Sequence, residues 1–352
     1  MAQSLSRISL KGGEKISFIT NLSTMLSAGI PIIDAVDSLL EDTKGGQRVI
    51  IETLKKDLMQ GNRVYLSFAK FPGTFDSVTV NLIKASEEAG TLETTLKDLR
   101  GHILKEMEFT DRIKAALIYP LVILFVFVAV LILILIFVVP KISNVFKKLR
   151  VELPLPTKIM VFVSDLVVNQ TWYFVGGLAA MVLFVIILFR TKRNFFINIL
   201  ISFPLVSQLV KEIDLTRFSR SLYLLLSAGL PITSALELSH DVVFRPHLAQ
   251  LITKSREMIL SGKRLSDGFR TAKGSIPSIV VKLIEAGEKS GSLDKSMQDI
   301  SEFLDYQVSN TLKNLTAVIE PIMLLVVGVF VGGMMMAIIA PIYGLIGQVG
   351  GR

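Results

Sequence analysis

The sequence of 352 residues contains no cysteine, three histidines and one tryptophan, and only 19% of its residues are charged. The absence of cysteine excludes disulfides, thiol chemistry and cysteine metal sites. His102, His240 and His247 share no metal-ligand spacing, and we interpret each as an isolated surface histidine. An apolar content of 51% and a mean hydropathy of +0.57 are too high for an ordinary soluble protein.

The sequence also lacks the short motifs of common enzymes. It has no Gly-x-x-x-x-Gly-Lys-Ser/Thr phosphate loop, no His-Glu-x-x-His and no Gly-x-Ser-x-Gly. The net charge of +8 fits lysines and arginines that flank membrane segments, because no basic stripe interleaved with aromatics is present. We therefore expect no enzymatic activity, no cofactor, no metal site and no nucleic-acid partner.

Three apolar runs, at 121–139, 174–189 and 322–346, account for the excess of apolar residues. Each is close to the ~20 residues that an α-helix needs to cross about 30 Å of hydrocarbon. Residues 1–13 contain no apolar core that would make a signal peptide. The sequence therefore predicts a protein that crosses the membrane several times and keeps its first hundred residues in the cytoplasm.

An internal duplication governs the whole chain. Residues 18–40 match residues 218–240, and residues 82–92 match residues 283–293. The register continues into the apolar runs, where Pro120 and Pro140 pair with Pro321 and Pro341. A repeat on this scale predicts two copies of one structural unit, each a polar domain followed by a membrane helix.

Apolar residues within each polar domain fall at helical spacing, and no alternating run indicates a strand. Gly29 is expected to end a helix in the left-handed conformation, with Pro31 opening the next helix, and Gly90 is expected to act as a similar stop. The repeated turn positions are Gly29, Pro31, Gly61 and Gly90 in the first copy and Gly229, Pro231, Gly262 and Gly291 in the second. The predicted fold is an all-α membrane protein with two homologous cytoplasmic helical bundles, about six helices each, and three transmembrane helices.

Two parallel repeats need one return crossing between them, which the second apolar run supplies. The expected segments are a lead at 1–13, the first cytoplasmic domain at 14–113, a span at 114–140, a periplasmic loop at 141–170, a second span at 171–190, a connector at 191–213, the second cytoplasmic domain at 214–315, a third span at 316–346 and a periplasmic tail at 347–352. The basic residues between Lys141 and Lys158 oppose this topology under the positive-inside rule. The repeat favours it, since inversion would export a domain that has no export signal.

A few residues are candidates for partner binding. Glu87 and Glu288 are acids present in both copies beside a helix end, although a solvated face or an ion pair with Arg63 or Arg264 is the commoner meaning. Gly328 and Gly332 form a small-residue face on the third span that allows close helix approach. The aligned positions of the first span are Ala129 and Leu133, so the repeat itself does not require glycine there.

The LSAGIP run at 26–31, the LSAGLP run at 226–231, the LIEAGEKSGSL run at 283–293 and the LPLPT run at 153–157 together resemble the PilC/GspF family. These are the inner-membrane platform proteins of type IV pilus and type II secretion machines. The resemblance covers roughly residues 14–346. It implies a non-enzymatic scaffold of the bacterial inner membrane that contacts a hexameric assembly ATPase, pilin transmembrane helices, other inner-membrane assembly proteins, a second copy of itself and lipid.

Two departures from the family pattern bear on partners. Lys84, Ser86 and Glu88 stand where the second copy has Glu285, Gly287 and Lys289, so the two surfaces are expected to serve different partners. The short segment before the first repeat resembles the type IVb versions, such as the platform of bundle-forming pili. The alternative function is a small permease with cytoplasmic regulatory domains, but the spans supply almost none of the polar residues that a midplane path needs.

Overall fold

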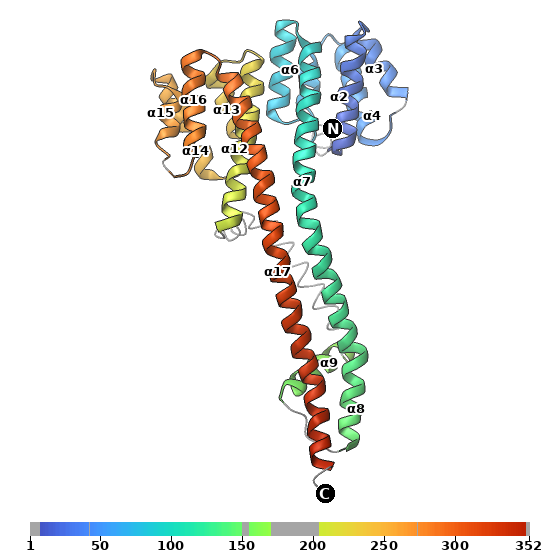
Figure 1. Cartoon of the computed structure of the whole chain (residues 1–352). Coiled ribbons are helices and arrows are strands. Elements are labelled where there is room, and N and C mark those ends of the chain that lie inside the picture. Colours follow the sequence, from blue (N-terminus) through green and yellow to red (C-terminus); the bar gives the residue numbers. More distant parts are fainter. Residues whose placement is uncertain (1–7, 42, 150–154, 170–203, 273, 350–352) are drawn as a thin grey trace. The chain divides into compact units, whose positions relative to one another are not determined.

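The computed structural model describes residues 8–41, 43–149, 155–169, 204–272 and 274–349, and over these ranges it contains helices and no strand (Figure 1). The expected second span at 171–190 lies outside the described residues, as does the connector as far as residue 203. The described chain forms two compact units. One draws its described residues from the ranges 1–112 and 208–310, and the other draws them from the ranges 113–207 and 311–352.

The first unit contains both polar domains, and their helices follow the same order. The first copy consists of α2 (Gly12–Ser27), α3 (Ile32–Glu41), α4 (Gly45–Met59), α5 (Val64–Ala69), α6 (Ser77–Ala89) and the start of α7 (Leu92–Leu133). The second copy consists of α12 (Pro204–Ser227), α13 (Ile232–His240), α14 (Pro246–Leu260), α15 (Leu265–Arg270), α16 (Ser278–Ser290) and the start of α17 (Leu293–Val349). The duplicated all-α fold predicted from the sequence is thus confirmed, with six helices in each copy.

The repeated glycines supply the turns between these helices. Gly29 and Gly229 have φ of 79° and 80°, and Gly90 and Gly291 have φ of 72° and 71°. After Gly29 the Ile30 N–H donates to the Met25 carbonyl at 3.0 Å, which closes a Schellman turn. Glycine adopts this left-handed conformation without the Cβ clash that other residues suffer. Pro31 and Pro231 each lie one residue before their helix, at the cap position, whereas the sequence placed them inside the first turn.

Aromatic residues at repeated positions fill the core of each bundle. Phe18 and Phe68 pack with ring centroids 5.9 Å apart, and their counterparts Phe218 and Phe269 pack at 5.4 Å. All four rings are buried. Burial of a phenylalanine side chain stabilises a fold by roughly 1.5–3 kcal/mol, so each of these four rings contributes to the stability of its copy. This explains why the same residues stand in both copies.

The second unit contains the apolar parts of α7 and α17 together with three shorter elements. Helical structure continues past Pro140: α7 is followed by a five-residue π-helix, η1 (Ile134–Val138), and then by α8 (Val139–Leu149). The segment expected as a loop at 141–170 contains most of α8 and all of α9 (Leu155–Asn169). Two stretches, Leu92–Phe146 and Leu293–Ile339, are long and apolar enough to cross a membrane, and most of each apolar window is exposed.

Candidate partner-binding surfaces

Each of the two candidate glutamates caps a short helix of its own copy. Glu87, near the end of α6, accepts the backbone N–H groups of Val64 at 2.8 Å and Tyr65 at 3.3 Å. Glu288 in α16 accepts the equivalent N–H groups of Leu265 and Ser266 in the second copy. Each carboxylate thus satisfies the free donors at the start of a six-residue helix, where a negative charge also interacts favourably with the helix dipole.

The two arginines lie on the surface and do not pair with these glutamates. Arg63 lies 3.4 Å from Glu88, the residue after the capping glutamate, and both side chains are about half exposed. Arg264 is also exposed, and its backbone N–H donates to Asp267. The guanidinium groups therefore remain accessible at equivalent positions of the two copies.

The outer faces of α6 and α16 carry reversed charges. The first copy has Lys84 and Glu88 one helical turn apart, where the second has Glu285 and Lys289. In the second copy Glu285 accepts from Lys289 and from Arg270, both at 2.7 Å. The hydrogen bond and charge of Lys289, with Arg270 beside them, hold the pKa of the exposed Glu285 carboxyl below its usual value. A single partner surface cannot be complementary to both faces in the same orientation.

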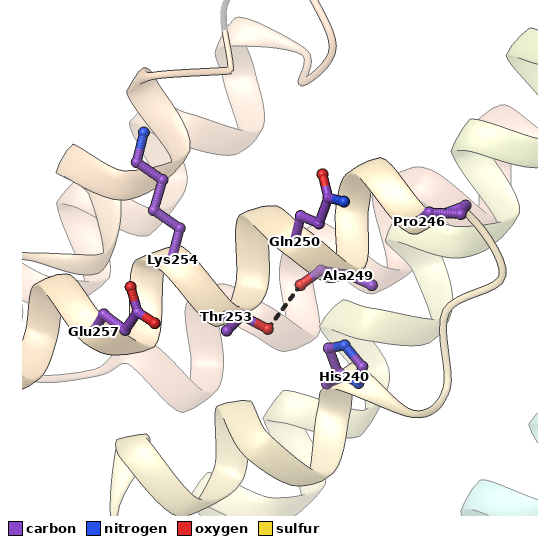
Figure 2. Close-up of a pocket in the computed structure, with 7 residues that line it drawn as sticks. All are labelled: His240, Pro246, Ala249, Gln250, Thr253, Lys254 and Glu257. Carbon is purple, nitrogen blue, oxygen red and sulfur yellow. Dashed lines mark hydrogen bonds between the residues drawn. The ribbon is translucent and has the colours of Figure 1, made fainter.

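Each copy also has an open hollow at the junction of its second and third helices. In the second copy the hollow measures about 440 Å³, with His240 from the end of α13 and six residues along α14 as its lining (Figure 2). The hollow of the first copy measures about 430 Å³ and is lined from α3 and α4. Lys56 in the first hollow corresponds to Glu257 in the second, so the charge is again reversed. No sequence pattern predicted these hollows, because they depend on how two helices pack against each other.

An ion-pair network joins the two copies within the first unit. Glu106 on α7 forms an ion pair with Arg217 at 3.2 Å and accepts a hydrogen bond from Arg220 at 3.0 Å, and both arginines are on α12. Asp305 on α17 accepts from Arg112 on α7 at 2.8 Å and from Arg220 at 3.5 Å. Arg220 thus bridges the two acids with only 8% of its side chain exposed. These residues were not among the sequence candidates, because none of the four pairs is local in the sequence.

An aromatic ring of the first copy packs against this network, and a histidine lies one helical turn from Glu106 on α7. The Arg220 guanidinium lies over the ring of Phe109 at 5.3 Å, an attractive cation–π geometry. His102, one turn before Glu106, is partly buried rather than on the surface as the sequence suggested, and its Nδ1 has no hydrogen-bond partner among the described residues. Burial lowers the pKa of His102 to about 4, against the attraction of Asp76. Burial would raise the pKa of Asp76, but hydrogen bonds from Thr79 and the charge of Lys15 hold it below its usual value.

The small-residue face of α17 is open. A Cβ built on Gly328, Gly332 or Gly333 meets no atom within 4 Å among the described residues. Phe330 lies on the other side of the helix, where its ring packs edge-on against Phe127 of α7 at 5.6 Å. The third span therefore contacts the first through Phe330 and presents its glycines elsewhere.

No cluster of three or more His, Cys, Asp or Glu side chains suited to a metal ion occurs within the ranges that the structure describes. What the geometry offers is a pair of related helical domains, each with its own surface chemistry, continued by long apolar helices. This arrangement defines a duplicated helical membrane protein with two related polar domains.

Comparison with known proteins shows to which family this chain belongs. Residues 18–140 and 218–341 each match the family described as "Type II secretion system (T2SS), protein F", and the chain belongs to this family. It is 27% identical over 351 residues to the type IV pilus assembly protein TapC of Aeromonas hydrophila, covering 95% of this chain and 83% of that protein. It is 29% identical to the type IV pilus assembly protein PilC of Pseudomonas aeruginosa, covering 97% of this chain and 94% of that protein. The type II secretion system protein F of the same species is 26% identical, covering 92% and 80%.

Proposed function

We propose that this protein is the non-enzymatic inner-membrane platform of a type IV pilus or type II secretion machine, where it couples a cytoplasmic assembly ATPase to the insertion of pilin into a growing filament. The observation that carries the proposal is the double family match, which includes the polar domain and the apolar helix of each copy. The names of the pilus-assembly and secretion relatives support the same role.

Both polar domains are cytoplasmic in this proposal, and the C-terminus is periplasmic. In each copy one uninterrupted helix leads from the polar domain into the apolar segment, α7 in the first and α17 in the second. Two copies of the same fold joined in the same way cross the membrane in the same direction, so the segment at 171–190 makes the return crossing. Reporter fusions at Lys44, Arg150 and Asp241 are expected to read inside, outside and inside, and an outside signal at Asp241 would overturn this topology.

The charge-reversed faces are the proposed docking surfaces for the ATPase. Lys84 and Glu88 on α6 meet one site, and Glu285 and Lys289 on α16 meet a different one, because charges arranged in opposite order select different partners. The accessible guanidinium groups of Arg63 and Arg264 flank these faces. Rim charges of this kind act mainly on association rate and specificity.

The open glycine face of α17 is the proposed contact for a pilin transmembrane helix or for a second copy of the protein. A rival function, a small permease, requires polar residues along a path at mid-membrane depth. The first and third apolar runs, 121–139 and 322–346, contain no charged residue at all. The platform role needs surfaces and no path, which is what this chain offers.

The test is deletion of the gene in its host, followed by separate measurement of three steps. Filament assembly is expected to stop, while ATP hydrolysis by the ATPase and processing of prepilin continue. Co-purification of the ATPase from membranes is then compared between a Lys84→Glu/Glu88→Lys variant and a Glu285→Lys/Lys289→Glu variant, which keep the total charge. Equal capture by wild type and both variants would contradict the docking surfaces, and peptide cleavage or ATP hydrolysis by the purified chain would contradict the scaffold role.

A further inference from the structure

The helix α9 has an unusual distribution of side chains. Its buried stripe contains Thr157, Val161 and Ser164, which follow one another at intervals of four and three residues. Its most exposed stripe is apolar and consists of Leu155, Ile159, Phe162 and Leu166, which are 77%, 64%, 66% and 41% exposed. Val167 is buried as well, so the buried side combines two hydroxyls with two valines, while the most exposed stripe is wholly apolar. A helix of a soluble domain would bury such an apolar stripe.

The two buried hydroxyls each hold α9 to a membrane helix of the same unit. Ser164 donates to the backbone carbonyl of Leu135, within the π-helix η1, and Thr157 donates to the carbonyl of Ala337 in α17 at 2.6 Å. α9 also packs against η1 and α8, and Figure 1 shows it beside α8 and α17. The acceptors belong to the apolar runs 121–139 and 322–346, where water is not available to bond the two hydroxyls and a backbone carbonyl serves as their acceptor.

The exposed stripe continues the exposed apolar surface of the neighbouring membrane helices. Leu133 and Phe137, on either side of the Ser164 bond acceptor, are mostly exposed, and so is Met336, next to the Thr157 acceptor. Exposed apolar surface on helices that cross the membrane faces the hydrocarbon of the bilayer. Because α9 is fastened to these helices through both hydroxyls, its apolar stripe belongs to the same surface.

The two charged residues of α9 occupy a third sector. Lys158 and Asp165 are seven residues apart, so they share one side of the helix, and both are exposed. At 100° per residue this side flanks the apolar stripe and does not interrupt it. A helix with an apolar stripe and a charged edge suits the plane of the membrane interface, with the stripe among acyl chains and the charges among headgroups.

We infer that α9 is an in-plane membrane anchor: the stripe of Leu155, Ile159, Phe162 and Leu166 inserts into the acyl chains of one leaflet, and Thr157 and Ser164 fasten the helix to the long apolar helices. The ligand is bilayer lipid. The sequence predicted a periplasmic loop at 141–170. In this proposal the second half of that segment, α9, is bound to lipid. The inference rests on membrane insertion alone and is independent of the proposed role in pilus assembly or secretion.

The natural absence of cysteine allows a direct test in the full-length chain. Single cysteines replace Ile159 and Phe162 on the apolar stripe and Asp165 on the charged edge, and each variant is labelled with a nitroxide and reconstituted into liposomes. Collision rates with oxygen, which concentrates in hydrocarbon, are compared with those of a water-soluble nickel chelate. Two matched controls set the scale: Phe125→Cys, 71% exposed on the first span, and Met59→Cys, 69% exposed on α4.

If α9 is an anchor, the ratio of oxygen to nickel-chelate collision rates for labels at 159 and 162 should equal the ratio for the label at 125. That ratio should be at least tenfold higher than the ratio for the label at 59. The label at 165 should lie closer to the ratio at 59. Two results overturn the inference. Nickel access at 159 and 162 equal to that at 59 places the stripe in water, and shielding from both reagents places it against protein, either residues of this chain or a second copy.

A second variant tests the fastening bonds. Thr157→Val, which is isosteric, and Ser164→Ala, which deletes only the hydroxyl oxygen, together remove both donors, and they are combined with the label at Phe162. The label is expected to gain mobility, because α9 loses its two polar bonds to the long helices. An unchanged spectrum would show that the hydroxyls do not hold the helix and would overturn that part of the inference.

Discussion

The carboxylate of Glu87 lies 2.8 Å from the backbone nitrogen of Val64, and it accepts a second N–H from Tyr65. A residue that looked like a surface acid thus supplies the cap of a helix that begins 23 positions earlier in the chain. Glu288 repeats the arrangement in the second copy with Leu265 and Ser266. Conservation of this acid between the copies therefore has a structural cause.

Replacement of Glu87 by Gln should loosen α5. The amide keeps one acceptor but loses the charge, which contributes about 1–2 kcal/mol when a carboxylate binds backbone N–H groups at a helix start. Hydrogen–deuterium exchange of the segment 64–69 in the full-length protein should rise, and Glu288→Gln should have the same effect on 265–270. The matched control is Glu88→Gln, which removes only the exposed pair with Arg63. Equal effects of Glu87→Gln and Glu88→Gln would contradict the capping role.

The left-handed glycines give a second prediction. Gly29→Val and Gly229→Val should each destabilise their copy by about 1–2 kcal/mol, because a β-branched residue is strained at a φ near 80°. A Cβ at Gly29 meets no atom within 4 Å, so the backbone alone carries this cost. Gly29→Asn is the control, since asparagine tolerates this conformation better. Exchange of α2 and α3 amides should follow the order Gly, Asn, Val, and an equal rate in all three would refute the account.

The network around Arg220 should set how firmly the two copies hold together. Arg220→Met leaves Glu106 and Asp305 with fewer donors in a partly buried site and should weaken the association by about 1–3 kcal/mol. Spin labels at Met59→Cys and Leu260→Cys report the distance between the copies, whose distribution should broaden. Lys105→Met is the control, because its pair with Glu302 is exposed on both sides. An unchanged distribution in Arg220→Met would show that other contacts suffice.

His102 predicts how stability depends on pH. Its pKa is about 4 in the fold and about 6.5 in an unfolded chain, so the unfolded state binds the proton first as pH falls. The neutral histidine therefore contributes fully to the free energy of unfolding above pH 6.5. As the pH falls from about 6.5 to about 4, the free energy of unfolding should decrease by an amount on the order of 2–3 kcal/mol. Amide exchange in the first turns of α7 should rise across this window. His102→Gln should flatten the response, and His247→Gln should leave it as in the wild type; a pH response retained in His102→Gln would contradict this origin.

The duplication was readable from the sequence because helix stops and core phenylalanines recur at an offset of 200 or 201 residues. Gly29 and Gly229 predicted their turns from residue type alone, since few other residues accept a positive φ. The cap by Glu87 was not readable, because its partners depend on how α5 packs against α6. The same holds for Arg220, whose acids come from two different long helices. The π-helix at Ile134–Val138 and the docking of α9 follow from tertiary hydrogen bonds, which leave no periodic signal in the residues that make them.

The glycine face of α17 gives the last prediction. Gly328 and Gly332 lie one turn apart, and none of the described residues comes within 4 Å of a Cβ built on either, while Phe330 between them packs toward Phe127 of α7 on the other side of the helix. Glycine costs a helix roughly 1 kcal/mol relative to alanine, so its presence on one stripe needs a compensating contact, and close approach of another helix supplies one.

Replacement of both glycines by Leu adds bulk to this stripe and should impair filament assembly, while membrane insertion continues. Ala129→Leu on the first span, at the position aligned with Gly328, is the matched control and should leave assembly intact. Cysteines at Gly328 and Gly332 then identify the neighbour in an otherwise cysteine-free chain. Crosslinks to pilin or to a second copy support a partner interface. Crosslinks that form only with a cysteine placed within residues 171–190 show instead that the face packs inside the chain, and the interface prediction is then wrong.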